Sequence, residues 1–412
     1  MTVFNPEWKV TIGSIEYTNV TLSGVTMTSG RTDIYSQAVA GYCTLNIINL
    51  DEAAFTFQVN DGLTLQLKDS SGAYVSIFGG TLTDIGIEVS AAGVAGIATS
   101  ATLTALGALA RLPKALTAGV LNKALDGVQI ETILTDLLVN NWTEVPAALQ
   151  WNTYPATETW ENAQNTGLGE IDTGIYELEN RSSEITDVYS LVSALANSGF
   201  GYLYEDAQGR ISYAGADHRQ NYLANNGYTT ISANVASSNG IRTITQSGDV
   251  RNDISLSWKS GTVTASDATS IASFGKLSQN IQTTLENSVD AISQADRYLS
   301  LRSYPRAKFE SITFPVTSPE IDDTTRDKLL NVSMGLPIRI TDLPLNIAGG
   351  QFEGYVEGWT WSVGLNSIYL TINVSPIEFS QVAIQWQQVS VAESWNTLSN
   401  TLTWENAIGA VV

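Results

Sequence analysis

The sequence predicts a mainly β protein of several domains with inserted α/β parts. Three observations indicate this fold class. The first hundred residues alternate apolar and polar side chains with a period of two, stretches with helical spacing are short and lie between strand-rich regions, and 412 residues exceed what one hydrophobic core usually organises. We therefore expect several domains, with boundaries near residues 115, 245 and 380.

Strand signals dominate the first region, residues 1–115. Apolar side chains alternate in residues 55–59 and again in 63–67, and the turn sequence Asn60-Asp61-Gly62 between them predicts a hairpin. Residues 17–28 alternate in the same way until the phase shifts by one residue at Gly24. A β-bulge at this glycine would return the apolar side chains to one face.

The middle region, residues 116–245, is predicted to be α+β. Apolar residues fall at helical spacing near 128–140 and near 187–196. The second of these helices is expected to be capped by Thr186 and to end before Gly199.

A second strand-rich region is expected at residues 246–380. Its strands are interrupted by a long helix near 287–302. The Ser- and Ala-rich residues 266–273 suggest a loop.

The charge balance argues against a protein that reads DNA sequence. The chain has 20 basic and 41 acidic residues and a formal charge of -21, which repels a phosphate backbone. A sharper hypothesis is that the acids line a channel through which DNA slides without binding. Neither a signal-like start nor an apolar run long enough for a membrane span is present, so we expect synthesis in a cytoplasm and no membrane span.

The residue inventory offers little for catalysis or metal binding. His218 is the only histidine and Cys43 the only cysteine, so multi-histidine zinc sites and intramolecular disulfides are excluded. We interpret His218 as a loop residue and Cys43 as a buried strand residue, and we expect no catalytic, metal or cofactor site. Carboxylate pairs are abundant, which keeps a glycan hydrolase open as an alternative.

One local pattern occurs twice. The segment Trp-Asn-Thr followed by Thr-Trp-Glu-Asn-Ala is found in the middle region and again in the C-terminal segment, residues 381–412. Its tryptophans are interface or saccharide-contact candidates: Trp151, Trp160, Trp395 and Trp404. Large apolar rings favour core or subunit contacts, and their flat faces also suit sugars, so a receptor-binding protein that grips cell-wall saccharide is the second alternative.

Several short segments of the chain resemble those of a known family. They are Gly30-Arg31-Thr32-Asp33-Ile34, residues 37–45, Val250-Arg251-Asn252-Asp253-Ile254, residues 270–275, residues 291–306 and the Trp-Glu-Asn-Ala ending. In this order they resemble the minor tail proteins, or distal tail hubs, of long-tailed actinobacterial bacteriophages, in which an Arg-Asp turn precedes Gln-x-x-x-Gly-Tyr and a strand.

The resemblance implies a tail hub fold, with two tail-tube-like β-barrel domains and smaller α+β domains. It implies a homotrimer in the virion, at the tail tip, assembled in the host bacterial cytoplasm. Its partners would be the tail tube or distal tail protein, tail fibre or tip proteins, the tape-measure protein, and DNA that passes without specific binding. The resemblance brings no catalytic residues, so we expect a structural protein and not an enzyme.

Overall fold

The computed structural model describes residues 4–17, 20–32, 36–49, 54–91, 98–137, 168–236, 241–305, 307–364 and 366–377. Its largest element is one 13-stranded sheet, so the mainly β fold class is confirmed. Seven strands come from the first region: β1 (Trp8–Ile12), β2 (Ile15–Tyr17), β3 (Val20–Gly30), β4 (Val39–Asn49), β5 (Gly62–Lys68), β6 (Tyr74–Ala91) and β7 (Ala98–Leu106). Six come from the later chain: β15 (Thr229–Ser232), β16 (Ile241–Thr245), β20 (Ala307–Pro315), β21 (Pro337–Thr341), β22 (Phe352–Val363) and β23 (Ile368–Pro376).

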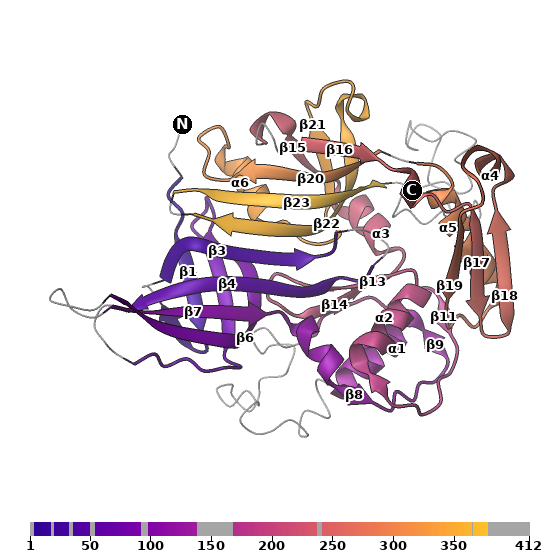
Figure 1. Cartoon of the computed structure of the whole chain (residues 1–412), viewed down its shortest axis with the longest axis horizontal. Helices are drawn as coiled ribbons and strands as arrows, with labels where there is room; N and C mark the ends of the chain where they lie inside the picture. The colour runs from indigo at the N-terminus through magenta and orange to yellow at the C-terminus, as the bar shows by residue number, and fades with distance from the viewer. Residues whose placement is uncertain are drawn as a thin grey trace.

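The two halves of this sheet are joined by an antiparallel pair between β3 and β22. The register runs from Gly30 opposite Gly358 to Val25 opposite Val363. The strand order is β16-β20-β23-β22-β3-β4-β7-β6-β5-β1-β2, and β21 with β15 branches from β22 (Figure 1). Strand β3 pairs with β4 and with β22, and it does not pair with β2 at the end of the series. Among the described strands the series is therefore open, and no closed barrel is present.

Alternating burial builds the core of the first half of the sheet. In β5 the side chains of Leu63, Leu65 and Leu67 are fully buried, as the period of two predicts. The expected bulge is confirmed: the β3–β4 register shifts between Thr21 and Thr26, and Gly24 has a φ of 87°.

The hairpin predicted at the turn Asn60-Asp61-Gly62 is wrong in its first arm. Residues 54–58 form no strand, and β5 pairs with β1 and β6 instead. The apolar residues of 54–58 still serve the core, because Phe57 is buried and its ring lies 5.7 Å from that of Tyr17. Burial without pairing thus produces the same alternating signal.

The middle part lies mostly at the lower right of the large sheet in Figure 1 and combines short strands with helices. Its elements are the 3-10 helix Ala108–Lys114, β8 (Leu116–Thr117), β9 (Ala124–Leu125), α1 (Asp126–Thr135), β10 (Leu168–Ile171), β11 (Glu177–Leu178), β12 (Thr186–Asp187), α2 (Val188–Ser198), β13 (Tyr202–Glu205), β14 (Ile211–Ala214) and α3 (His218–Asn226). Helix α2 begins one residue later than expected, because Asp187 and not Thr186 caps it, accepting from the Ser190 N–H.

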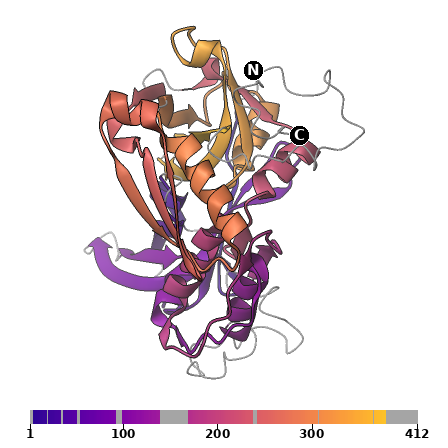
Figure 2. The same cartoon turned by 90° about the vertical axis from the view of Figure 1, so that its right-hand side faces the viewer.

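A small module stands at the right of Figure 1 and faces the viewer in Figure 2. It consists of β17 (Asp253–Trp258), β18 (Gly261–Ser266), α4 (Ala268–Phe274), β19 (Ser278–Gln282) and α5 (Ser288–Arg302). The expected long helix is α5, which packs on β17 and β18. The loop expected at residues 266–273 is wrong, because Asp267 caps α4 there by accepting from the Ser270 N–H.

The remaining elements of the later chain connect its strands. Helix α6 (Asp323–Leu330) lies between β20 and β21 in the chain, and three short 3-10 helices span Ala233–Val235, Ser247–Asp249 and Ala348–Gly350. No described helix combines the length and apolar character that a bilayer crossing requires.

Candidate functional site

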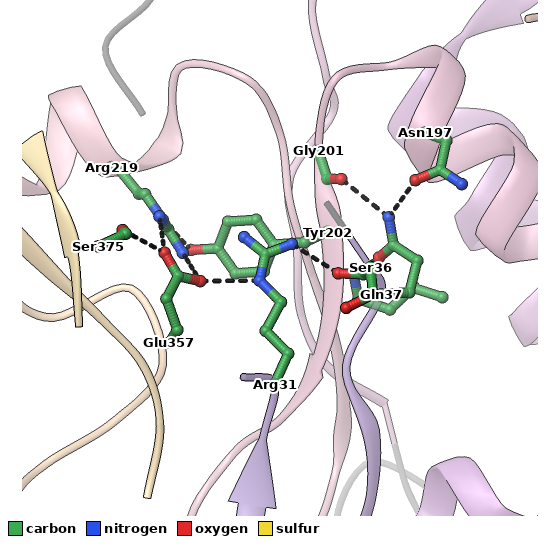
Figure 3. Close-up of polar contacts among 10 residues, drawn as sticks. Arg31, Ser36, Gln37, Asn197, Gly201, Tyr202, Arg219, Glu357 and Ser375 are labelled. Carbon is green, nitrogen blue, oxygen red and sulfur yellow. Dashed lines mark hydrogen bonds and ion pairs between the residues drawn. The ribbon is translucent and has the colours of Figure 1, made fainter. Parts of the chain in front are cut away.

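A buried ionic cluster lies where the two halves of the large sheet meet the middle part. We call it the Glu357 cluster; it comprises Arg31, Tyr202, Arg219, Glu357 and Ser375 (Figure 3). These residues come from the end of β3, from β13, from the first turn of α3, from β22 and from β23. The cluster therefore ties together segments from the whole length of the described chain.

Glu357 is the centre of the cluster and accepts from both arginines. Arg31 Nε donates to Oε2 over 2.7 Å, and Arg219 donates through Nη1 to Oε1 over 2.7 Å and through Nη2 to Oε2 over 2.9 Å. Ser375 Oγ donates to Oε1. Bidentate pairing of this kind fixes the geometry as well as the charge.

Tyr202 supports both guanidinium groups. The guanidinium carbon of Arg219 lies 4.5 Å from the Tyr202 ring centroid, and that of Arg31 lies 4.9 Å from it. Arg219 Nε also donates to Tyr202 Oη over 3.1 Å. Stacking on an aromatic face stabilises a desolvated cation, so the tyrosine helps to hold two like charges close together.

Burial alone would raise the pKa of Glu357, because it penalises the charged form. The neighbouring Arg219 and Arg31 overcome this effect and lower the pKa to about 2. The same attraction raises the pKa of Arg219 above its ordinary value, against the opposite effect of burial. Glu357 and Arg219 are therefore both charged at neutral pH.

Gly30 allows β3 to approach β22 at this point. Its φ is 89°, and a Cβ atom there would lie 2.4 Å from the Glu357 carbonyl oxygen. The next residue uses this closeness: the Arg31 N–H donates to the same carbonyl over 2.8 Å. Only glycine fits both the backbone conformation and the space.

Gln37 clamps the loop before β4 to the middle part. Its Nε2 donates to Asn197 Oδ1 over 2.7 Å and to the Gly201 carbonyl over 3.2 Å, and its Oε1 accepts from the Leu203 N–H over 2.8 Å. All three partners lie at the end of α2 or on β13 and just before it. A single amide side chain therefore fixes the position of that turn.

Glu205 is a second buried acid at the same junction, with backbone donors as its partners. The Gly41 N–H donates to Oε2 over 2.7 Å and the Leu109 N–H to Oε1 over 2.6 Å. Burial raises the pKa of Glu205 to about 7, and the two N–H groups oppose this rise. A third buried acid, Asp126, accepts from Tyr213 Oη, and burial raises its pKa to about 6.

The four predicted tryptophan candidates, Trp151, Trp160, Trp395 and Trp404, lie outside the described residues. His218 is not a plain loop residue, because it begins α3 and its Nδ1 lies 2.8 Å from Asp172 Oδ2. Cys43 is fully buried on β4, as expected. No group of metal-ligating side chains forms among the described residues.

Sequence reasoning missed the charged residues of the junction. Glu357 lies within the buried residues 354–359 of β22, and Glu205 ends the buried strand Tyr202–Glu205. An acid in the buried part of a strand is a usable signal, because such a charge requires a partner. The partners themselves lie far away in the chain and carry no local mark.

The fold of the chain is similar to those of known structures. The chain resembles the 43 kDa tail protein of prophage MuSo2 from Shewanella oneidensis with a TM-score of 0.54 and 13% identity, covering 91% of this chain and 99% of that one. It resembles the tail protein from Neisseria meningitidis MC58 with a TM-score of 0.56 and 10% identity, covering 92% and 98%. No protein-family model matches the sequence, and no curated protein matches it. The chain thus has the fold of these two tail proteins.

Proposed function

We propose that this chain is a structural hub at the tip of a bacteriophage tail, a homotrimer that joins the tail tube or distal tail protein to fibre or tip proteins. The observation that carries the proposal is the fold, which matches a prophage tail protein and a second tail protein over 91% and 92% of the chain. The residues of the tail-protein-like motif support it, since Gly30, Arg31, Gln37 and Gly41 all serve the junction described above.

The construction suits a mechanical role. One sheet runs through both halves of the chain, and the Glu357 cluster and Glu205 fasten the middle part to it. A body held in this way can carry load between neighbours as a unit. The trimeric state and contact with the tape-measure protein are parts of this proposal that come from the family resemblance.

Passage of DNA without specific binding belongs to the same proposal. The formal charge of -21 supports a channel lining that repels phosphates. Imaging of the assembled particle would test it, because a neutral or basic channel wall contradicts the idea.

We also propose that the chain acts without catalysis. The buried acids that geometry singles out are held by structural partners: Glu357 by two arginines, Glu205 by two backbone N–H groups and Asp126 by Tyr213. The hydrolase alternative would be established if the purified protein released sugars from host cell walls and if substitution of a single carboxylate residue abolished this release.

Two measurements test the hub. Antibodies against the chain should label the tail tip of particles of the encoding phage in electron micrographs, and the purified protein should form rings with three times the 44.2 kDa mass of one chain, alone or on added tail tubes. Particles that lack the chain altogether, or that carry it elsewhere, would overturn the proposal. A monomer that binds host cell-wall glycan would favour the saccharide-binding alternative suggested by the repeated tryptophans.

A further inference from the structure

Eight strands of the large sheet form an antiparallel series that runs from β16 to β6. Every neighbouring pair in it is antiparallel, and Figure 1 shows the series from β16 at the top to β6 at the bottom. Because the number of strands is even, β16 and β6 run in opposite directions. The strand β6 of one copy and β16 of another can therefore pair in the same antiparallel manner.

The second part of β6 has an open edge. Its first part pairs with β5, but that ladder ends at Thr81, and among the described strands residues 83–91 pair with β7 alone. Residues 86–89 are all exposed. An unpaired strand edge of this length is a template for another strand, and natural sheets usually protect it.

Apolar side chains accompany this open edge. Ile87 and Val89 are 60% and 63% exposed. They nevertheless lie on the core face of the sheet, because Ile87 is opposite Ala101, which is fully buried. Large aliphatic side chains that are exposed on a core face indicate a surface that another molecule covers.

The backbone groups at the open edge of β6 belong to the same core-facing residues. The Gly107 N–H donates to the Gly41 carbonyl, so odd-numbered residues form the bonded pairs between β4 and β7. Because backbone direction alternates along a strand, β7 bonds β6 through even-numbered residues of both strands. The N–H and C=O groups of Ile85, Ile87 and Val89 therefore point away from β7, to the open edge.

Strand β16 has an open edge of matching polarity. It ends the sheet and, among the described strands, pairs only with β20. The Val316 N–H donates to the Ile368 carbonyl, so even-numbered residues of β20 bond β23, and Ser311 bonds β16. The residues on either side of the partner of Ser311 are Ile241 and Thr243, and their N–H and C=O groups point away from β20.

The joint between β3 and β22 shows what two such edges form. The Arg31 N–H donates to the Glu357 carbonyl, and Met27 with Trp361 is a bonded pair further along the same ladder. Met27 and Trp361 face the core and are 1% and 2% exposed. A pair between β6 and β16 would repeat this arrangement between two copies, since both edges present the backbone groups of core-facing residues.

We propose that copies of this chain join head to tail, by an antiparallel pair between residues 83–91 of β6 and β16 of the next copy. The proposal rests on the proposed self-assembly of the chain and names the surfaces that meet. Unlike edges at opposite ends of one sheet make a heterologous contact, which generates a ring when the rotation closes. A strand from another protein fits less well, because the chain itself carries an edge of matching direction and polarity.

Disulfide formation between copies tests the joint. Thr243 can be bonded only to a residue whose backbone groups reach the open edge of β6, so three double variants combine Thr243→Cys with Ile85→Cys, Ile87→Cys or Val89→Cys. Opposite residues of an antiparallel pair lie about 4.5–5.5 Å apart at Cα, which a disulfide spans. Oxidation should give covalent dimers and trimers in at least one double variant.

The single variants are the matched controls for this experiment. A head-to-tail joint brings unlike edges together, so Thr243→Cys alone or Ile87→Cys alone should give no covalent product. The parent chain is the blank, because its only cysteine, Cys43, is buried.

A charge at the open edge of β6 should weaken the assembly. Ile87→Lys should raise the concentration at which the assembly dissociates at least about tenfold, because the joint would bury the new charge in place of an isoleucine. Val289→Lys is the control, since Val289 is an equally exposed aliphatic residue, at 70%, but lies on α5 of the small module. Sedimentation measures both, and thermal melts establish that the variants are folded.

Four results would overturn the proposal. The first is that no double variant gives covalent products although the chain forms multimers, and the second is that Ile87→Lys assembles as the parent does. The third is a covalent dimer of a single variant, which would show that like edges pair about a two-fold axis. The fourth is a chain that stays monomeric both alone and on added tail tubes. None of these results bears on the position of the chain in the tail, which the labelling experiment tests separately.

Discussion

Arg31 and Glu357 lie 326 positions apart in the chain, and Arg31 Nε donates a hydrogen bond to Glu357 Oε2 over 2.7 Å. The bond stands beside the β3–β22 pair, where Gly30 is opposite Gly358, so it reinforces the only ladder that joins the two halves of the described sheet. Because Arg219 shares the same carboxylate, this carboxylate also fastens α3 of the middle part to both halves.

Removal of the Glu357 charge should therefore destabilise the protein strongly. Glu357→Gln leaves two buried arginines without their counter-ion, and breaking a buried pair in this way costs about 3–5 kcal/mol. The free energy of unfolding from urea titration at neutral pH is the measurement. We expect the mutant to unfold at a clearly lower urea concentration.

The matched control lies on the same strand. Glu353 pairs with Arg339 over 2.8 Å, but both side chains are about one-third exposed. Glu353→Gln should cost less than about 1 kcal/mol, because solvent screens the pair. Equal losses in the two variants would show that the Glu357 cluster contributes no more than a surface ion pair.

The elements of this fold were predictable where the signal is local. The bulge at Gly24 and the helices α2 and α5 each follow from residues within a few positions of one another. The false strand before Asn60 shows the limit of the method, since Phe57 is buried by packing and not by pairing. The periodicity of apolar residues indicates which side chains are buried, and strand pairing must be inferred from that burial.

The junction was not predictable in the same way. Glu357 and Glu205 carry a weak mark as acids in buried strands, but Arg31, Arg219 and the Leu109 N–H are selected as partners only by the folded chain. The strand pairing that unites β3 with β22 is equally remote in sequence. A single sequence contains no information on such distant pairs.

The buried acid Glu205 should make stability depend on pH. Burial raises its pKa from 4.5 to about 7, so the folded state holds the proton more tightly than the unfolded chain does. The stability associated with this group is present at low pH and is lost as pH rises from 4.5 through about 7, a change on the order of 3 kcal/mol.

Substitution isolates this contribution. Glu205→Gln does not titrate, and it keeps an oxygen acceptor for only one of the two N–H groups of Gly41 and Leu109. The loss of the other bond does not depend on pH, so the parent should still lose stability relative to the variant between pH 5 and pH 8, by roughly the stated amount. The difference between the two proteins is the quantity to read, because Asp126 titrates in both. A difference that stays flat with pH would show that Glu205 keeps its ordinary pKa.

Gly107 should be intolerant of a side chain for a related reason. A Cβ atom there would lie 2.0 Å from Glu205 Oε2, and two N–H bonds prevent that carboxylate from moving aside. Gly107→Ala should cost about 1–3 kcal/mol, as overpacking does. Gly248→Ala is the control, since no atom lies within 4 Å of its new methyl group and stability should hardly change.

A double-mutant cycle identifies the cause. Combined with Glu205→Ala, which removes the obstructing carboxylate, Gly107→Ala should cost at least about 0.5 kcal/mol less than it does in the parent. Unfolding free energies of the four proteins give this coupling directly. Strict additivity would locate the strain elsewhere than at Glu205.

Substitution of the repeated tryptophans should show whether they form a subunit contact or a sugar-binding site. Trp160 and Trp404 hold equivalent places in the two copies of the pattern. If they are interface anchors, Trp160→Ala or Trp404→Ala should shift dissociation of the proposed trimer to higher protein concentration, because truncating such an anchor costs about 2 kcal/mol or more. Sedimentation over a range of concentrations measures this shift, and Trp258→Ala, outside the repeat, serves as the control. The alternative result is that the parent binds purified host cell-wall glycan, that both repeat variants lose this binding, and that their self-association is unchanged. This result would assign the pattern to saccharide binding, because a flat ring that stacks on sugar need not touch another subunit.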